Sequence, residues 1–379
     1  MPELHCNLSE ALTEGIFVFH SRSFHLMFKT ICIVGPETLY KIYTDEYKIA
    51  ECGKIIGSDP TSGVYENSYR AIYNLMSIID PSEGHDFVLL SLILSRTLRD
   101  NCGDFFSNVP PADIERFLDF IATTVLHHFE CFRRNVFGFS EIKDMKYATL
   151  RPFMENKEEP KVYYDSDGFA IATFATASLF NHSCDPNVIR FTGKRFGRTA
   201  FVALKPLKKG EELVISYGPV YGQIDDHGAK SRRDILSRKY NFLCDCIACS
   251  SNWPPVRELQ SKAPEFCCNS CAPKFTYIST VSPEFSLCRL MDNFKCRLCR
   301  KQHSRKFYEK ELDRVMKSVE VCKMLTLSNA APVEAVGNLK VAINFLQNSL
   351  CPPDKNSTFA PKIFREAVNL IIYFANSNQ

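Results

Sequence analysis

Cysteine, histidine and asparagine side chains gather near the middle of this chain of 379 residues. The segment SLFNHSCDPN, residues 178–187, places Asn181, His182 and Cys184 almost side by side directly after an apolar stretch. The segment CDCIAC adds further cysteines, at Cys244, Cys246 and Cys249. Three thiolates can occupy three corners of a tetrahedral zinc site, and we expect Cys184 to supply the fourth. Buried thiols without a metal are the alternative, which the polar neighbours of these cysteines disfavour.

A second group of cysteines follows as a CxxC pair, CNSC and then CRLC, with 24 residues between the two halves. The expected ligands are Cys268, Cys271, Cys296 and Cys299. This spacing is slightly wider than that of a typical zinc ribbon, and Cys267 or Cys288 could replace one ligand or be a bystander. A structural zinc ion has all four positions filled by protein, so neither site argues for metal catalysis.

The overall composition sets limits on class and compartment. The chain has 46 Lys and Arg against 43 Asp and Glu, a net charge of +3, whereas nucleic-acid binding normally needs a concentrated basic face. Its longest apolar run, residues 87–94, is far shorter than the roughly 20 residues that cross a bilayer, and it predicts a buried helix. The N-terminus lacks a basic region before an apolar one. We therefore expect a location in the cytoplasm, the nucleus or both, where the 17 cysteines stay reduced.

Hydrophobic spacing predicts which elements must position these side chains. Apolar residues at three- and four-residue spacing predict helices over residues 10–137, and the same pattern returns from residue 307 onward. Between them lie short β-like runs (VYY, FAIATF, VIRFT, TAFVAL, ELVISY), separated by the turn signals DSDG, CDPN, TGKRFGR and LKKGE. A polar helix is expected over residues 222–240, leading into the cysteines. The fold class is therefore α+β.

Three motifs together resemble a known family. NHSCDPN, GEELVISYG and RRDILSRKYNFLCDCIAC are similar, in order and spacing, to the SET domain and post-SET segment of the SET and MYND domain-containing lysine methyltransferases. The stretches FCCNSC and CRLC are similar to the branch that includes the fourth vertebrate member and its arthropod relatives. The family's glycine-containing (GxG) cofactor loop and MYND zinc finger are not found, and ELHCNL at the start resembles only the end of that finger.

The resemblance implies a SET-domain β-fold with a pseudoknot, a helical insertion, a zinc-bound post-SET segment and an α-helical C-terminal region. The division expected from it is a helical segment that follows the missing finger (1–60), the helical insertion (61–132), the second half of the SET domain (133–240), the cysteine-rich zinc region (241–302) and helices similar to tetratricopeptide repeats (303–379).

The resemblance also implies roles for particular residues. Those matching cofactor contacts for S-adenosylmethionine are Ser178, Leu179, Asn181, His182, Phe242, Tyr73 and Asn135. Tyr217 matches a tyrosine beside the transferred methyl group, and Tyr240 matches an aromatic wall of the lysine channel. Methyl transfer to an amine is an in-line displacement, so the enzyme mainly has to desolvate and aim a neutral amine. Two structural zinc ions and one bound S-adenosylmethionine are the expected cofactors.

The implied function is methylation of a lysine in a histone or another protein substrate. One alternative is an inactive SET scaffold that binds partner proteins through the C-terminal helices, favoured by the missing glycine-containing loop. A third is a zinc-ribbon protein that binds nucleic acid through the basic run RLCRKQHSRK at residues 297–306, which is more often a solvated surface. We expect no membrane contact, and we expect nucleic-acid binding least.

Overall fold

The computed structural model describes residues 21–44, 72–73, 75, 84–144, 165–192, 199–204, 207–222, 228–274, 287–327 and 332–377. It divides into one unit made of Met1–Phe139 with Gly168–Leu179 and a second made of Ser140–Asp167 with Phe180–Gln379. The strand expected at VYY, the turn at TGKRFGR and parts of the expected segments 1–60 and 61–132 lie outside the described residues.

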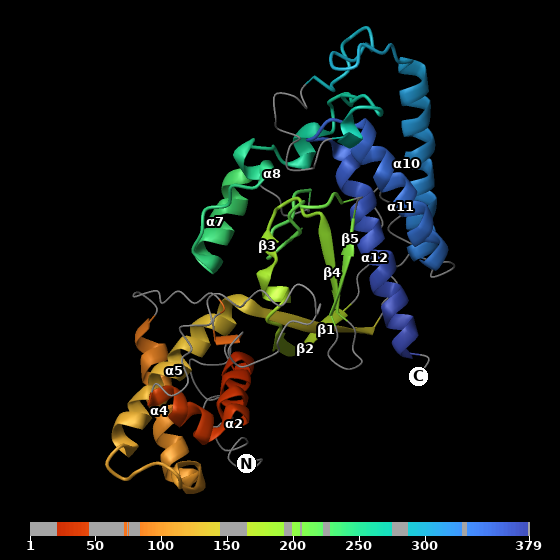
Figure 1. Ribbon diagram of the computed structural model, residues 1–379. Helices are drawn as coiled ribbons and strands as arrows, with labels where there is room; N and C mark the ends of the chain where they lie inside the picture. Colours follow the sequence, from red (N-terminus) through yellow and green to blue (C-terminus); the bar gives the residue numbers. More distant parts are fainter. Residues whose placement is uncertain are drawn as a thin grey trace. The chain divides into compact units, whose positions relative to one another are not determined.

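The described residues of the first unit include the helices α2 (Ser21–Tyr43), α4 (Gly84–Asn101) and α5 (Ile114–Asn135), drawn from red to yellow in Figure 1. Helix α5 buries an apolar face whose members recur every three or four residues: Phe117, Ile121, Val125 and Phe129. Full burial of such side chains contributes roughly 1.5–3 kcal/mol each. The Tyr40 hydroxyl of α2 donates to Asp113, the residue before α5, at 2.8 Å. The helices predicted for this region are confirmed where they are described.

Helix α2 bends at Gly35, where φ is 79° and ψ is 162°, far from helical values. A positive φ strains any residue with a Cβ, and the following Pro36 lacks the N–H that a continuous helix would use. The bend therefore follows from the Gly-Pro pair.

Helix α4 contains the apolar run 87–94, whose prediction as a fully buried helix is wrong for one face. Its outward side chains are 40–56% exposed, namely Val88, Leu89, Leu92 and Ile93. Leu90, Leu94 and Leu98 are at most 3% exposed in the core that α4 shares with α5. The run is apolar all round, but among the described residues one stripe of the helix meets a neighbour and the other stays exposed.

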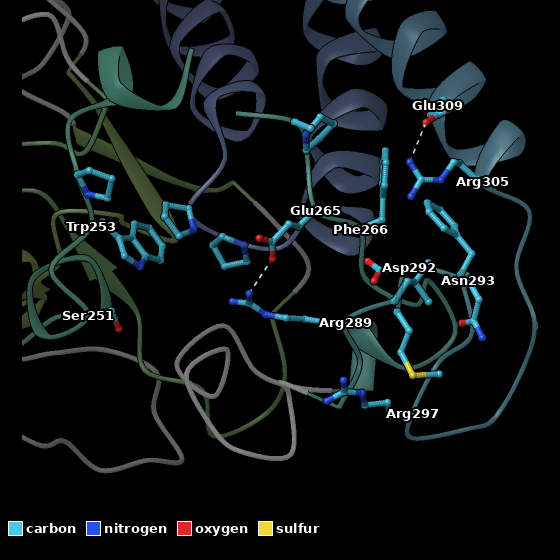
Figure 2. A pocket seen from close by; sticks show the side chains of 18 of the residues that line it. Ser251, Trp253, Glu265, Phe266, Arg289, Asp292, Asn293, Arg297, Arg305 and Glu309 are labelled. Atoms are coloured by element: carbon cyan, nitrogen blue, oxygen red, sulfur yellow. Dashed lines mark hydrogen bonds and ion pairs between the residues drawn. The ribbon is translucent and has the colours of Figure 1, made fainter. Parts of the chain in front are cut away.

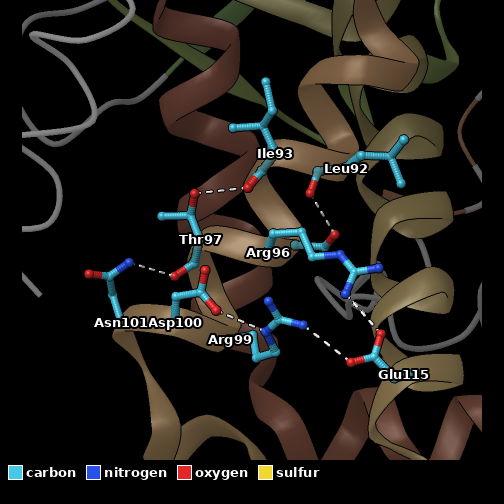
Figure 3. Close-up of polar contacts among 9 residues, drawn as sticks. Leu92, Ile93, Arg96, Thr97, Arg99, Asp100, Asn101 and Glu115 are labelled. Carbon is cyan, nitrogen blue, oxygen red and sulfur yellow. Dashed lines mark hydrogen bonds and ion pairs between the residues drawn. The ribbon is translucent and has the colours of Figure 1, made fainter.

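Polar contacts tie α4 to α5 beside the exposed apolar residues (Figure 3). Glu115 accepts hydrogen bonds from Arg96 at 2.8 Å and from Arg99 at 3.2 Å. These side chains are largely exposed, so the pairs contribute little to stability and mainly fix the register of the two helices.

Three two-stranded sheets are formed among the described residues. Strand β1 (Val136–Asp144) pairs with β2 (Asp165–Thr173), and β2 includes DSDG, so the prediction of a turn there is wrong. Pairing with β1 carries the extended backbone through these turn-prone residues. The strand prediction for FAIATF is confirmed in β2.

The other two sheets belong to the second unit. The short strands β3 (Asn181–His182) and β6 (Val214–Ile215) pair in parallel, so residues 33 apart in sequence lie side by side. Strand β4 (Val188–Thr192) pairs with β5 (Thr199–Ala203) in an antiparallel register that places Arg190 opposite Phe201. The strands predicted at VIRFT and TAFVAL are confirmed, while the one at ELVISY is limited to its two central residues.

The helices described in the second unit are α7 (Ala229–Tyr240), α8 (Ile247–Ser250), α10 (Arg305–Leu327), α11 (Pro332–Ser349) and α12 (Lys355–Ser377). Figure 1 shows α10, α11 and α12 side by side, with α12 next to β4, and the contacts between these elements agree. Residues of α10–α12 form an apolar core that also takes in Phe191 of β4. The helix predicted before the cysteines and the C-terminal helices are confirmed. Within the described part of the chain, no helix has the length and apolar character to span a membrane.

Candidate functional site

The first cysteine group comes together around the end of β3 and the start of α8. The sulfur atoms of Cys184, Cys244, Cys246 and Cys249 all lie within 4.8 Å of one another. Those of Cys184 and Cys249 are 3.6 Å apart, close to the roughly 3.8 Å expected when four sulfurs surround a zinc ion at about 2.3 Å. A disulfide would need about 2 Å. The donor set therefore fits a structural zinc ion.

Two arginines of α7 hold the backbone of this cysteine segment. The Arg232 guanidinium donates from Nη2 to the carbonyl oxygens of Ala248 at 3.0 Å and Trp253 at 3.4 Å, and the side chain is only 1% exposed. Arg233 donates from Nε to the carbonyl of Cys244 at 2.9 Å. The sequence analysis did not identify Arg232. It occupies the buried stripe of α7 with Ala229, Leu236 and Tyr240, and a charged residue at an apolar position of a helix was the available signal.

Replacing Arg232 by methionine should lower the free energy of unfolding of the second unit by about 2–5 kcal/mol. The methionine keeps most of the stem but leaves two buried carbonyl groups without the charged donor. Urea denaturation followed by far-UV circular dichroism measures the change. The matched control is Arg238→Met on the exposed face of α7, expected to change stability by less than about 0.5 kcal/mol. Equal losses in the two variants would contradict the role given to Arg232.

Four aromatic side chains gather beside this cysteine group. Tyr217 is the centre, with ring centroids 5.3 Å from His182, 5.0 Å from Tyr240 and 6.4 Å from Phe242. The Tyr217 hydroxyl donates to the carbonyl of Phe180 at 2.5 Å, and the Tyr240 hydroxyl donates to the carbonyl of Tyr217 at 2.9 Å. We call His182, Tyr217, Tyr240 and Phe242 the aromatic cluster. The structure thus brings together four residues that the sequence analysis had assigned to one site.

His182 links the aromatic cluster to the cysteine group. Its Nδ1 accepts the backbone N–H of Tyr217 at 3.0 Å, which leaves Nε2, 3.2 Å from the Cys184 sulfur, as the protonated nitrogen. Burial lowers the pKa of His182 to about 4, so the ring is neutral and its Nε2–H can donate to the Cys184 sulfur. A metal-bound cysteine is oriented by such outer contacts, and here the contact leads directly to the aromatic cluster.

Stability at alkaline pH should report the burial of Tyr240. Burial raises the pKa of Tyr240 from 10.0 to about 12, so the folded state favours the neutral phenol. The resulting contribution to the free energy of unfolding is complete below the pKa of tyrosine in the unfolded chain. It is lost, by roughly 2–3 kcal/mol, as the pH rises toward the pKa of Tyr240 in the folded state. At about pH 8, Tyr240→Phe should be about 1 kcal/mol less stable than wild type, because it loses one buried hydrogen bond. Above about pH 11 this difference in the free energy of unfolding should become smaller or change sign, because wild type then loses the contribution of its neutral phenol. Urea unfolding across this pH range is the measurement, and a pH-independent difference would contradict the assignment.

The other residues that were predicted to contact the cofactor lie in different parts of the structure. Asn181 is exposed and donates from Nδ2 to Glu212 at 2.6 Å. Four others belong to the first unit: Ser178, Leu179, Tyr73 and Asn135. Ser178 donates to the Asn135 carbonyl at 3.4 Å, and the ring of Tyr73 lies 4.3 Å from that of His127. The roles of these residues stay predictions.

The second cysteine group also fits a zinc ion. The sulfur atoms of Cys268, Cys271, Cys296 and Cys299 lie within 4.8 Å of one another, and those of Cys268 and Cys299 are 3.7 Å apart. Nε2 of His303 is 3.2 Å from the Cys268 sulfur and could orient it. Of the two bystander candidates, Cys288 is buried against this group, whereas Cys267 lies against Cys351.

A cavity of about 1350 Å³ lies between the two cysteine segments and the start of α10 (Figure 2). Trp253, Phe266 and Phe294 contribute apolar surface, and Arg289 pairs with Glu265 across it at 2.7 Å. Arg305 at its far side lies over the Phe294 ring. No member of the aromatic cluster lines this cavity, so it is separate from the expected site of chemistry.

Comparisons with known proteins indicate the class of protein that this chain resembles. A family model described as SET domain matches residues 46–218. Protein-lysine N-methyltransferase SMYD4 of Pongo abelii is 27% identical over 260 residues, covering 64% of this chain and 31% of that protein, and the Homo sapiens protein is 26% identical over a similar span. A SET and MYND domain-containing protein of Dictyostelium discoideum is 34% identical over 100 residues, covering 26% of this chain and 24% of that protein.

Residues 46–218 are therefore similar to a SET domain, and the chain is distantly similar to protein-lysine methyltransferases. More particularly, it is similar to SMYD4 at about 27% identity, and over a shorter span to a SET and MYND domain-containing protein at 34% identity. The chain matches about a third of the length of the SMYD4 relatives.

Proposed function

We propose that this chain is an S-adenosylmethionine-dependent protein-lysine N-methyltransferase. The observation that carries the proposal is the aromatic cluster, held by hydrogen bonds from Tyr217 and Tyr240 and joined through His182 to the first cysteine group. Aromatic walls suit an amine that must lose its water before reaction and a product that carries positive charge. The SET domain match supports the same reaction class.

The chain's own residues supply positioning. Tyr217 and Tyr240 are neutral at physiological pH, and burial raises the pKa of both hydroxyl groups further above the ordinary value of 10.0. They therefore act as hydrogen-bond donors and as walls. S-adenosylmethionine supplies the methyl group when bound. Asn181, exposed at β3, carries an amide that can donate and accept, which fits the charged methionine part of that molecule. Zinc at the first cysteine group would hold the backbone that carries Tyr240 and Phe242 close to β3.

Several finer assignments belong to this proposal. The substrate is a lysine of a histone or another protein, the compartment is the cytoplasm, the nucleus or both, and partner proteins bind the helices α10–α12. The pseudoknot, the domain boundaries and the placement in the branch with the fourth vertebrate member are also proposed.

Calorimetric titration of the zinc-loaded chain with S-adenosylmethionine tests the proposal. We expect micromolar binding that is lost in Asn181→Ala and kept in Asn344→Ala, an exposed asparagine of α11 that serves as the matched control. Tyr217→Phe should still bind. No heat at millimolar cofactor with a folded protein would overturn the enzymatic function and leave a partner-binding scaffold.

A further inference from the structure

The cavity between the two cysteine segments borders a strongly basic stretch of the chain. Residues 287–306 contain one acidic residue, Asp292, against seven Lys and Arg: Arg289, Lys295, Arg297, Arg300, Lys301, Arg305 and Lys306. The net charge of the whole chain is only +3, so this excess is local. Four thiolates around a zinc ion leave two negative charges, which offset only part of it. This part of the surface therefore attracts anionic partners.

Three of these arginines line the cavity, and Figure 2 shows them at separate points around it. Arg289 pairs with Glu265 at 2.7 Å and Arg305 pairs with Glu309 at 3.6 Å, but the two arginine side chains are 46% and 60% exposed. Such exposed pairs contribute little and exchange partners readily. Arg297 is exposed and has no ion pair among the described residues. Arg297 is therefore the side chain best placed to bind a carboxylate from a partner.

The cavity lining also contains half-exposed apolar side chains. They are Met291 and four prolines: Pro254, Pro264, Pro352 and Pro353. A volume of about 1350 Å³ exceeds the roughly 300–1,000 Å³ of typical small-molecule sites. The cavity is therefore large enough for several side chains of an extended peptide, with apolar surface for at least one of them.

Backbone hydrogen bonds hold the arginine-bearing segment in place. The N–H of Leu290 donates to the carbonyl of Phe266 at 2.9 Å, and the N–H of His303 donates to the carbonyl of Phe294 at 2.9 Å. Cys296, next to Arg297, belongs to the second cysteine group. A binding surface that is already ordered loses less conformational entropy when a partner binds.

Nucleic acid fits this cavity less well than a peptide does. Carboxylates in the lining would repel a continuous phosphate backbone, and they belong to Glu265, Asp292 and Glu309. The rings of Trp253, Phe266 and Phe294 are only 4–6% exposed, so they offer no open face on which a base could stack. A peptide can place its few carboxylates opposite the arginines and turn other side chains toward the acidic residues.

We propose that this cavity binds an extended, acidic segment of a partner protein. An apolar side chain of the segment packs against Met291 and the prolines, and a neighbouring Asp or Glu binds Arg297. A guanidinium can hold a carboxylate through two parallel hydrogen bonds, which an amide cannot match. The interaction is independent of methyl transfer, because no member of the aromatic cluster lines the cavity.

Selection from a library of short random peptides displayed on phage, with the zinc-loaded chain as bait, tests the proposal. The enriched peptides should carry several Asp or Glu around one aliphatic or aromatic residue. Synthetic copies are then measured by fluorescence anisotropy. Replacing the acidic residue beside the apolar one by its amide should weaken binding about tenfold, as expected for one charge-assisted interaction.

Variants of the chain locate the binding site. Arg297→Gln should weaken binding of the enriched peptides about tenfold, and Arg297→Glu should weaken it further. Met291→Asp should also weaken it, by removing the apolar contact. The control is Lys340→Glu, an equal charge reversal at an exposed position of α11, which should stay within about twofold of wild type. Circular dichroism shows whether each variant is folded, and the exposed Arg297 can be changed without disturbing the core.

Three outcomes would overturn the proposal. The first is enrichment of neutral or basic peptides, or of none, by the folded wild-type chain. The second is an affinity for acidic peptides that is unchanged in Arg297→Glu. The third is binding of a single-stranded oligouridylate that is lost in Arg297→Glu, without binding of acidic peptides, which would assign the cavity to nucleic acid.

Discussion

Cys184→Ser should reduce the zinc content of the purified chain from two ions to one and unfold the segment that joins β3 to α8. Cys184 is fully buried, and its sulfur lies among the other three of its group, which are 60 or more residues further along the chain. Structural zinc contributes about 10–16 kcal/mol of apparent binding free energy in small zinc-dependent folds, so losing one ligand removes a large share of local stability. Elemental analysis after dialysis against a chelator gives the stoichiometry.

Matched cysteine variants make this result specific. Cys271→Ser should also leave one zinc ion, from the other group, while Cys288→Ser should keep both because its sulfur is outside the set of four. Cys322→Ser removes a thiol equally buried in α10 and should keep both ions as well. A loss of zinc in Cys288→Ser would mean that the second site uses a different ligand set.

Tyr217→Phe should slow methyl transfer by about 10²- to 10³-fold while changing S-adenosylmethionine binding less than about twofold, an effect typical of losing one donor at a reaction centre. The Tyr217 hydroxyl makes a 2.5 Å hydrogen bond to the Phe180 carbonyl, and a small displacement of positioned groups is costly in rate. Single-turnover kinetics with saturating cofactor separates the rate of transfer from binding.

The control for this prediction is Tyr308→Phe. The Tyr308 hydroxyl accepts the backbone N–H of Asn269 at 3.1 Å in another part of the second unit. The Tyr308→Phe variant therefore also loses a buried, hydrogen-bonded hydroxyl. Its rate should stay within about twofold of wild type. Equal slowing in both variants would show that Tyr217 acts through stability and not at the reaction centre.

The spacing of residues predicted the cysteine groups well, because close ligands such as those in CDCIAC must share a site whatever the fold. Arg232 was missed for a different reason. It is a charged residue whose role depends on which face of α7 is covered, and that is decided by packing between distant segments. The sequence also could not show that Asn181 and Ser178, three positions apart, fall on opposite sides of a boundary between two units.

The local pattern of apolar and polar residues was also sufficient to predict most of the helices and strands. Helices and strands with strong periodicity were predicted correctly, including α7, β4 and the C-terminal helices. The two errors share a cause, because the structure of each segment depends on contacts with residues that are distant in the sequence. DSDG extends into a strand because β1 pairs with it, and the run in α4 stays half exposed because one face has no neighbour within the described residues.

The sheet of β4 and β5 joins the apolar core of the C-terminal helices to the aromatic cluster. Phe191 packs in that core, while Phe201 stacks on Phe180, whose carbonyl accepts the Tyr217 hydroxyl. A slip of one residue in this strand pairing would exchange the two faces of β4 and bury the Arg190 guanidinium among apolar side chains. We therefore expect substitutions deep between α10 and α12 to disturb the aromatic cluster at a distance.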